Sequence, residues 1–404
     1  MERRTKYQYT YFIHPFIIEE KKYEEYITRL IKDKRCHLKV FTKEKDLDVY
    51  TFFMPKVRKY LFWSISYNQE QLRTFQELGR TLQIRMLTQK PCVMFDYDLG
   101  DFPQGKVGEK DGIFFDIPKM EIICFKTGIC FLLIKTILNE ANMLSEVINF
   151  NYKFRDINSD YAKLQEYENI KIQTERFQHM KDFKQIIQEI TGKNDLMAKL
   201  NLQNERFLTY TYVCLEQEFW NEKKPFTELE NEFAKLKNVL PYKAQINLIE
   251  QGKQEITLST LQYVKIGVTK QAIALLTSSV NTENYTKIPH RYERSYLYAY
   301  ILALYKQVFL ERTKYDFQKR NFTKTEKNFI QFTESIWNEE VTCEVDGSEF
   351  YKNIIKTLKL DDLYQEVKNR YQIANKKSNT RRIQDISYIL LAIFLIIIIQ
   401  MLLF

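Results

Sequence analysis

The sequence predicts an α+β protein: a mixed α/β domain at the N-terminus, a bundle and stalk of long helices, and a single C-terminal transmembrane helix. Three observations support this class. Short aromatic and β-branched runs alternate with helical spacing before about residue 150. Apolar stripes at helical spacing follow residue 286, and residues 386–404 carry no charge at all.

Composition limits the class of protein further. Aromatic residues make up 15% of the 404 residues, with only 10 Gly and 8 Pro, which indicates ordered and densely packed structure. The net charge of +9 suits a membrane-proximal protein and does not by itself indicate nucleic-acid binding. Six scattered cysteines without a C-x-x-C, and four histidines, predict no zinc site and favour free thiols in a reducing compartment. The N-terminal stretch is no signal peptide, because His14 and Pro15 interrupt its apolar run.

Residues 1–150 are expected to form a cytoplasmic α/β domain with a mixed sheet and helices on one face. Strands are expected at residues 9–13, 37–41, 49–53, 60–65 and 93–95, and helices at 19–32 and 70–87. The apolar runs 113–125 and 129–137 flank Thr127 and Gly128. They predict a hairpin in which Gly128 supplies the positive φ of the turn.

Residues 151–285 read as a mainly helical cytoplasmic region with short strands. A helix is expected from about residue 160 to 190, ended by Gly192, and a strand or two within 257–269. Residues 286–380 are predicted to form a helical bundle and stalk, with a stripe of Leu297, Ile301, Leu304 and Val308.

Two more helices are predicted before the C-terminal segment. One covers residues 324–340, and the next starts at a capping box formed by Asp346 and Glu349. That last helix could continue through the polar stretch 375–380 into the C-terminal segment. A stalk helix feeding directly into a membrane helix is the simplest geometry.

The segment ISYILLAIFLIIIIQMLLF, residues 386–404, is expected to span the cell membrane once as an anchor. As a helix it would be about 28 Å long, and it lacks a polar face. Basic residues before it place the body in the cytoplasm. Lys376, Lys377, Arg381 and Arg382 could also bind anionic head groups, or serve only as a topology signal. Gln400 could join copies of the helix or line a pore, or simply reach the far interface.

Two groups of side chains are candidate ligand sites. Asp96, Asp98 and Asp101 could bind Mg²⁺, although Val107 stands where an EF-hand needs an acid, and a solvated loop is the alternative. His290, Arg291 and Arg294 begin an aromatic helix and could hold a nucleotide-like ligand. Alternatively, the arginines pair with Glu293 and its neighbours. No phosphate-binding loop or nucleophile motif occurs, so the chain is not expected to be an enzyme.

Three segments carry a family resemblance: ICFKTGICFLLIKTIL (123–138), YERSYLYAYILALYKQ (292–307) and FTESIWNEEVTCEVDGSEFYKNI (332–354). With the overall layout, they resemble divergent CorA-like membrane proteins of the CorA-type divalent-cation transporter superfamily. The resemblance implies a homo-oligomer, pentameric as in CorA, with a cytoplasmic funnel over membrane helices. CorA transporters have a second membrane helix and a Gly-Met-Asn loop; this sequence has neither, which puts selective Mg²⁺ transport in doubt.

Some CorA-like proteins act beside type III CRISPR systems as membrane effectors gated by a nucleotide messenger. The leading hypothesis is therefore an oligomeric, single-pass CorA-like effector that responds to a ligand or partner and forms a pore or perturbs the bilayer in phage defence. Mg²⁺ or a nucleotide messenger is the expected ligand, with no direct nucleic-acid binding. A reduced divalent-cation transporter or channel is the alternative, and a tail-anchored scaffold the third hypothesis.

Overall fold

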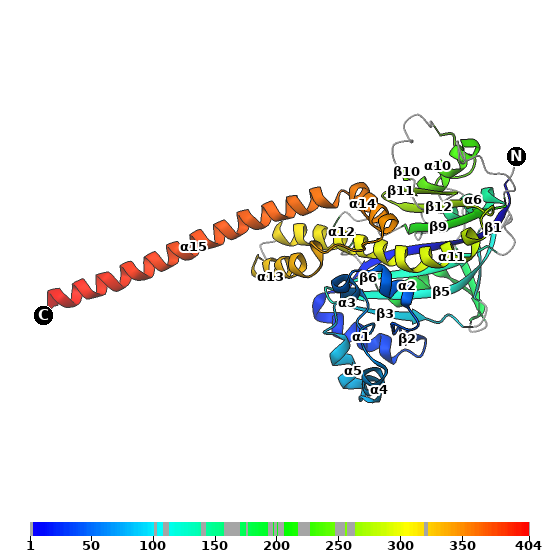
Figure 1. Ribbon diagram of the computed structural model, residues 1–404. Coiled ribbons are helices and arrows are strands. Elements are labelled where there is room, and N and C mark those ends of the chain that lie inside the picture. Colours follow the sequence, from blue (N-terminus) through cyan, green and yellow to red (C-terminus); the bar gives the residue numbers. More distant parts are fainter. Residues whose placement is uncertain are drawn as a thin grey trace.

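The computed structural model describes residues 3–100, 103–107, 113–138, 143–156, 170–174, 177–192, 197, 200, 206–216, 227–246, 255–256, 263–318 and 322–403. Their strands are β1 (Thr5–Ile17), β2 (Cys36–Leu38), β3 (Cys92–Tyr97), β4 (Gln104–Val107), β5 (Ile113–Phe125), β6 (Ile129–Ile137), β7 (Lys171–Thr174), β8 (Phe177–Asp182), β9 (Leu208–Leu215), β10 (Glu255–Ile256), β11 (Val264–Val268) and β12 (Ala272–Ser278). All of these strands belong to one sheet (Figure 1).

The helices are α1 (Tyr23–Lys32), α2 (Leu47–Phe52), α3 (Pro55–Leu61), α4 (Gln69–Glu77), α5 (Arg80–Leu87), α6 (Leu144–Phe154), α8 (Phe183–Thr191), α10 (Glu230–Asn238), α11 (Glu283–Arg291), α12 (Leu297–Gln318), α13 (Phe322–Phe332), α14 (Val345–Leu358) and α15 (Leu360–Leu403). Two π-helical turns interrupt this pattern, η5 (Tyr292–Tyr296) before α12 and η6 (Thr333–Trp337) after α13. Such turns are rare and often mark functional positions.

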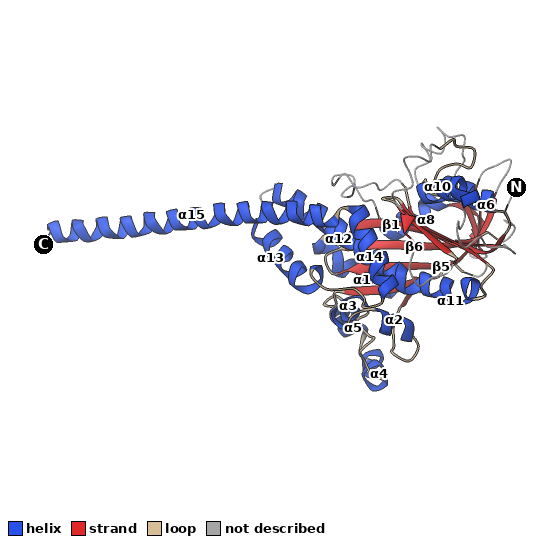
Figure 2. Ribbon diagram, turned by 45° about the horizontal axis from the view of Figure 1, so that its top comes forward, coloured by secondary structure: helices blue, strands red, loops and turns tan. Residues whose placement is uncertain are grey.

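The sheet runs in the order β10-β11-β12-β9-β1-β6-β5-β4-β7-β8, and β3 pairs with β5 and β2. It is mixed, because β12 lies parallel to β9 while β9 and β6 lie antiparallel to β1. Strands from before residue 150 and after residue 200 therefore share one sheet. Figure 2 shows this sheet at the centre of the body, with helices on both sides.

Both faces of β1 carry large apolar side chains, so both need a cover. Tyr9, Tyr11 and Ile13 face the core shared with α12, while Phe12 and Phe16 face a second core built with α1, α6, α8 and α10. The prediction of a mixed sheet is confirmed. The prediction of helices on one face is wrong, because alternate residues of β1 are buried on each side.

Helix α12 lies between the sheet and the helices α13, α14 and α15, and it is buried around most of its circumference. The predicted stripe of Leu297, Ile301, Leu304 and Val308 is buried, and so are the residues between. α12 is therefore the central support of the helical part.

Two short aromatic runs predicted as strands lie in helices and the turns that follow them. Residues 49–53 belong to α2 and its end, and residues 60–65 contain the last turn of α3 and the turns after it. Pro55 stands at the first turn of α3, where proline favours a helix start. Short apolar runs without a longer period do not distinguish a strand from a buried helix.

The long helix expected from residue 160 to 190 is also wrong where the structure describes it. Lys171–Thr174 and Phe177–Asp182 are the antiparallel strands β7 and β8, and only α8 is helical. Residues 157–169 lie outside the described residues. Gly192 follows α8 with a φ of +73°, as predicted, and β11 lies within the stretch predicted to hold a strand. The predicted capping box is absent, because Glu344 precedes α14 and Asp346 lies inside it.

The hairpin of β5 and β6 is confirmed. Gly128 has a φ of +82°, and its N–H donates to the Phe125 carbonyl at 2.8 Å. Its carbonyl accepts the Ile18 N–H at 2.7 Å, which ties the turn to the end of β1. A Cβ at Gly128 would lie 2.2 Å from the Ile18 carbonyl oxygen, so only glycine fits.

At the C-terminus, α15 is one helix of 44 residues, which begins against the body and then projects far beyond it (Figures 1 and 2). The predicted continuation of the stalk through residues 375–380 is confirmed. The prediction of a transmembrane helix is wrong. Within the described residues, no helix combines the length and hydropathy that crossing a bilayer requires. The predictions of a single-pass anchor, of a membrane or channel protein and of a membrane localisation are therefore wrong.

Substituting Gly128→Ala should destabilise the protein by about 2 kcal/mol or more, because alanine disfavours positive φ and meets the Ile18 carbonyl. Urea denaturation followed by tryptophan fluorescence measures this. The matched control is Gly79→Ser, since Gly79 has open space around it and precedes α5, where serine is favoured. Equal stability of the Gly128→Ala protein and the wild type would contradict this account of the turn.

Candidate functional site

A group of charged side chains lies between the sheet and the start of α12. We call it the charged cluster: Lys39, Asp96, Lys119, Glu121, Lys135 and Glu293. Lys119 of β5 is opposite Lys135 of β6, and Asp96 of β3 is opposite Glu121 of β5. Because side chains alternate along a strand, Lys119 and Glu121 share the face of Ile123 and Phe125, which meets α12.

Glu121 is the buried centre of the charged cluster, with a side chain only 1% exposed. It pairs with Lys39, and its Oε2 lies 3.2 Å from Nζ of Lys119. The Tyr298 hydroxyl donates to its Oε1 at 3.1 Å. Burial opposes the charge, but the two lysines outweigh it and lower the Glu121 pKa to about 2. The carboxylate is therefore held ionised.

Glu293, in the π-turn η5, is the second acid of the charged cluster, and its side chain is 16% exposed. Its Oε1 accepts the Tyr11 hydroxyl at 2.6 Å, and its Oε2 lies 2.6 Å from Nζ of Lys135. Burial opposes its charge, but Lys135 and Tyr11 lower its pKa. Lys119 also lies 3.8 Å from Glu293, so it bridges the two glutamates. The charged cluster thus connects β1, β5 and β6 to the start of α12.

Tyrosine hydroxyls from the sheet hold the irregular helix in which Glu293 lies. Pro289 cannot donate a helical hydrogen bond, and a π-turn shifts the regular bonding by one residue. Tyr9 donates to the Pro289 carbonyl at 2.8 Å and Tyr210 to the Tyr292 carbonyl at 2.8 Å. Tyr212 donates to the Asn284 carbonyl. Alternate residues of β1 and β9 therefore fix this helix to the sheet.

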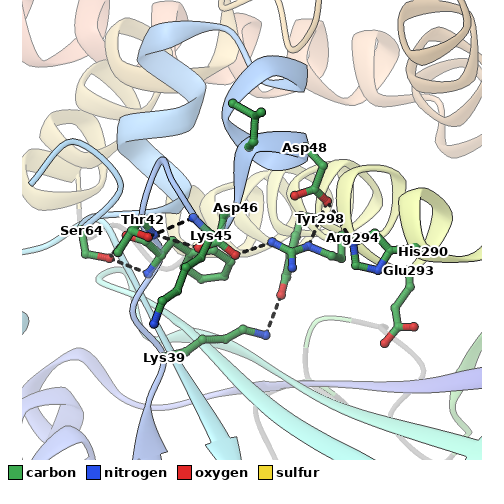
Figure 3. A network of polar contacts seen from close by, with 12 residues as sticks. Lys39, Thr42, Lys45, Asp46, Asp48, Ser64, His290, Glu293, Arg294 and Tyr298 are labelled. Carbon is green, nitrogen blue, oxygen red and sulfur yellow. Dashed lines mark hydrogen bonds and ion pairs between the residues drawn. The ribbon is translucent and has the colours of Figure 1, made fainter. Parts of the chain in front are cut away.

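Arg294 points away from Glu293, toward the loop after β2 (Figure 3). Its guanidinium pairs with Asp46, and its Nε lies 3.0 Å from Oδ2 of Asp48. Burial opposes the charge of Arg294, but the hydrogen bond to Asp46 and the charge of Asp48 outweigh it and raise its pKa. His290, 62% exposed, has Nε2 3.8 Å from the same Asp48 oxygen, and Arg291 pairs with Glu344.

The structure therefore brings His290, Arg291 and Arg294 onto one side of the helix, as candidates for an anionic ligand. Each already faces a carboxylate, and none of these carboxylates is Glu293. An incoming phosphate would have to displace Asp46 and Asp48 from Arg294. That His290, Arg291 and Arg294 bind such a ligand stays a prediction.

The other predicted site residues do not form a group. The Asp96 side chain is 45% exposed and lies 3.6 Å from Nζ of Lys39, and Asp98 accepts the Gly100 N–H at 2.8 Å. Asp101 lies outside the described residues, and within those residues no three metal-ligating side chains come together. Lys376 is exposed on α15; the side chains of Lys377, Arg381, Arg382 and Gln400 are outside the description.

The charged cluster does leave a signal in the sequence, namely charged residues within otherwise apolar strands. Lys119 and Glu121 interrupt the apolar strand 113–125, and Lys135 interrupts 129–137. A single charge within a buried strand requires a partner of opposite charge. The partner elements, the loop at Lys39 and the π-turn at Glu293, are distant in sequence.

A second buried charge, Lys306 of α12, lies beside the first turns of α15. Its Nζ is 3.3 Å from the Trp337 carbonyl oxygen and lies over the rings of Trp337 and Tyr351. Burial lowers its pKa to about 8. Trp337 in turn stacks on Tyr364 of α15, with ring centres 4.2 Å apart. Lys306 is thus part of the support for α15.

The charged cluster is suited to joining elements rather than to moving protons. Lys39 and Lys119 have raised pKa values and Glu121 and Glu293 lowered ones, so these four groups keep their charge near neutral pH. Asp96 is the exception, because its burial raises its pKa. General acid–base catalysis needs a pKa close to the working pH.

Substituting Glu121→Gln should cost about 3 kcal/mol at pH 7, because it leaves two partly buried lysines without their common partner. The folded pKa of about 2 lies below the ordinary value of 4.5, so the unfolded state binds more protons between them. Glu121 therefore stabilises the fold above pH 4.5 and loses this effect as pH falls toward 2. Denaturant unfolding at several pH values should show a weaker acid dependence in the variant. The exposed control Glu77→Gln should change neither quantity.

Substituting Lys306→Met should raise the free energy of unfolding at pH 7 by about 1–3 kcal/mol, because it removes a buried ammonium without a close carboxylate. Because the pKa of Lys306 is lowered to about 8, the unfolded state binds more protons between pH 8 and 10.5, and the contribution of Lys306 to the free energy of unfolding rises over this range. The variant should lack this rise. A less stable methionine variant would show that the contact with the Trp337 carbonyl outweighs the burial cost.

Comparison with known proteins adds no relative: no family model, no curated protein and no solved structure matches the chain.

Proposed function

We propose that this chain is a non-catalytic interaction protein, in which the α/β body supports α15 as a contact element for other molecules. One observation carries the proposal: beyond the body, α15 exposes large apolar side chains that the described part of the chain does not cover. The exposed fractions are 71% for Tyr388, 61% for Leu390 and 63% for Phe394. Exposed apolar surface of this extent is typical of interaction sites.

The root of α15 is built into the body, in contrast to its distal part. Leu360 and Val367 are fully buried, and Tyr364 packs against Trp337 and Phe329. Nζ of Lys314 lies 2.8 Å from Glu366, which adds a polar contact to the same turns. In this proposal, a change in the packing of α12, α13 and α14 would therefore change the orientation of α15.

The body is the ligand- or partner-responsive unit in this proposal. An anionic ligand, such as a nucleotide, would act where Arg294 is held by Asp46 and Asp48, one turn before α12. Since α12 contacts both the sheet and α15, this place is connected to the contact helix by packed side chains. The membrane-effector, transporter and anchored-scaffold hypotheses all need a spanning helix. Our proposal therefore contains no membrane-spanning segment.

The proposal requires that the distal apolar side chains of α15 contribute nothing to the stability of the body. A protein with Ile389→Lys and Ile393→Lys should unfold within about 0.5 kcal/mol of the wild type, because both side chains are exposed. Unfolding is followed by tryptophan fluorescence, since Trp63 and Trp337 lie in the body.

The matched control makes the same change in the same helix. Val367→Lys places a charge in the buried root and should cost several kcal/mol. If the two distal lysines destabilised the body as much as Val367→Lys does, the distal part of α15 would serve the chain's own fold, and the proposal would fail.

A further inference from the structure

We infer that Cys124 and Cys130 are a redox-active pair, which hydrogen peroxide oxidises to a disulfide across the β5–β6 hairpin and which a thiol reductant restores. The two residues lie directly opposite each other in the antiparallel register of these strands. Residues paired in this way have Cα atoms about 4.5–5.5 Å apart, within the range of about 4.4–6.8 Å that a disulfide requires. The backbone therefore already holds both cysteines where the bond can form.

Both thiols point into the same core and touch each other. They are free and fully buried in the core that α1, α6, α8 and α10 share with the sheet. Burial and a hydrogen bond with the Cys130 thiol raise the pKa of the Cys124 thiol. The Cys130 sulfur lies 3.6 Å from the Gly128 carbonyl oxygen, so the pair lies directly behind the turn of the hairpin.

The other buried cysteines cannot compete for either thiol. Cys92, on the neighbouring strand β3, faces the opposite core, the one shared with α12. Cys36 lies on β2, two strands from β5, and Cys214 lies on β9, two strands from β6. Strands two places apart are separated by about 9.5 Å, and a disulfide cannot bridge Cα atoms more than about 7 Å apart. The hairpin pair is therefore isolated from the rest of the buried cysteines.

Hydrogen peroxide alone balances the oxidation. The thiolate of one cysteine attacks a peroxide oxygen and breaks the O–O bond, which leaves a sulfenic acid and a hydroxide that takes up the thiol proton as water. The second sulfur then attacks the sulfenic sulfur, forms the S–S bond and expels the oxygen as a second water. Two electrons pass from the two thiols to the peroxide, and no other reactant is required.

Helix α1 controls access to the pair. The Tyr23 hydroxyl of α1 donates to the Cys124 carbonyl at 3.5 Å. Tyr26, on the same helix, donates to the Ile190 carbonyl at 3.1 Å. Because both thiols are fully buried, the peroxide reaches them only when α1 opens locally. Oxidation should therefore be slow in buffer and faster in urea below the unfolding midpoint, where such openings are more frequent.

The disulfide would fix the turn on which α12 rests. Arg312 of α12 donates to the Thr127 carbonyl at 2.6 Å, and the Gly128 carbonyl accepts the Ile18 N–H at 2.7 Å. A bond between positions that are already aligned constrains the unfolded chain more than the native turn. The oxidised chain should therefore unfold at a higher urea concentration than the reduced chain. Since the pair acts at the joint between the sheet and α12, this outcome is independent of the role proposed for α15.

Peptide mapping tests the bond in the full-length chain, with Cys343→Ser to remove the one exposed thiol. After treatment with hydrogen peroxide, the remaining thiols are alkylated in denaturant, and trypsin then cleaves after Lys126, between the two cysteines. Peptides 120–126 and 127–135 should appear as one linked species that dithiothreitol separates. The other buried cysteines should carry the alkyl label. This measurement needs no substitution in the hairpin, so it does not depend on a variant that folds.

Two matched variants connect the bond to the stability of the chain. Cys124→Ala should lose both the linked species and the shift of the urea midpoint on oxidation. Cys92→Ala, which changes the neighbouring strand on the opposite face, should keep both.

Alkyl labels on both Cys124 and Cys130 after exposure to peroxide in partially denaturing urea would overturn the inference. A bond from Cys124 to a different cysteine would overturn it as well. An oxidised chain that unfolds at a lower urea concentration would show that the bond distorts the hairpin, which contradicts the fit argued from the register.

Discussion

The joint between the sheet and α12 is an ionic one, and the rest of the structure depends on it. Removing a carboxylate from water is costly, and only well-placed opposite charges compensate that cost. Glu121 can be buried, and Glu293 partly buried, only if Lys39, Lys119 and Lys135 reach them at the same time. Four elements must therefore be in place together: the loop after β2, the strands β5 and β6, and the π-turn before α12. This requirement gives specificity, because an alternative register of these elements would leave a charge buried alone.

The irregular start of α12 follows from the same requirement. In the π-turn, Glu293 reaches the sheet while Arg294 reaches Asp46 and Asp48 on the other side. The hydroxyls of Tyr9 and Tyr210 then satisfy carbonyls of the distorted turns. Once α12 is fixed, the stack of Trp337 on Tyr364 sets the position of the α15 root, and Lys306 lies beside this stack. The direction of the projecting helix is thus determined by contacts that begin at the sheet.

The sequence reveals features that depend on neighbouring residues, and it hides those that depend on distant ones. The hairpin at Gly128 was predictable because a glycine between two apolar runs has one common explanation, and the continuity of α15 because nothing interrupts it. The pairing of β1 with β9, and of β9 with β12, leaves no local trace. For the same reason the sequence showed His290, Arg291 and Arg294 but not their carboxylates, since Asp46 lies 248 residues from Arg294.

The apolar end of α15 shows how a correct local pattern can support a wrong conclusion. A helix that is apolar on every side needs a cover, and hydropathy alone does not identify what covers it. The structure adds two facts: the described part of the body does not provide the cover, and the turns that precede the apolar end are anchored in a folded domain. Hydropathy therefore identifies a surface that needs a cover, whereas only the packing of the root shows that this surface begins where the contacts with the body end.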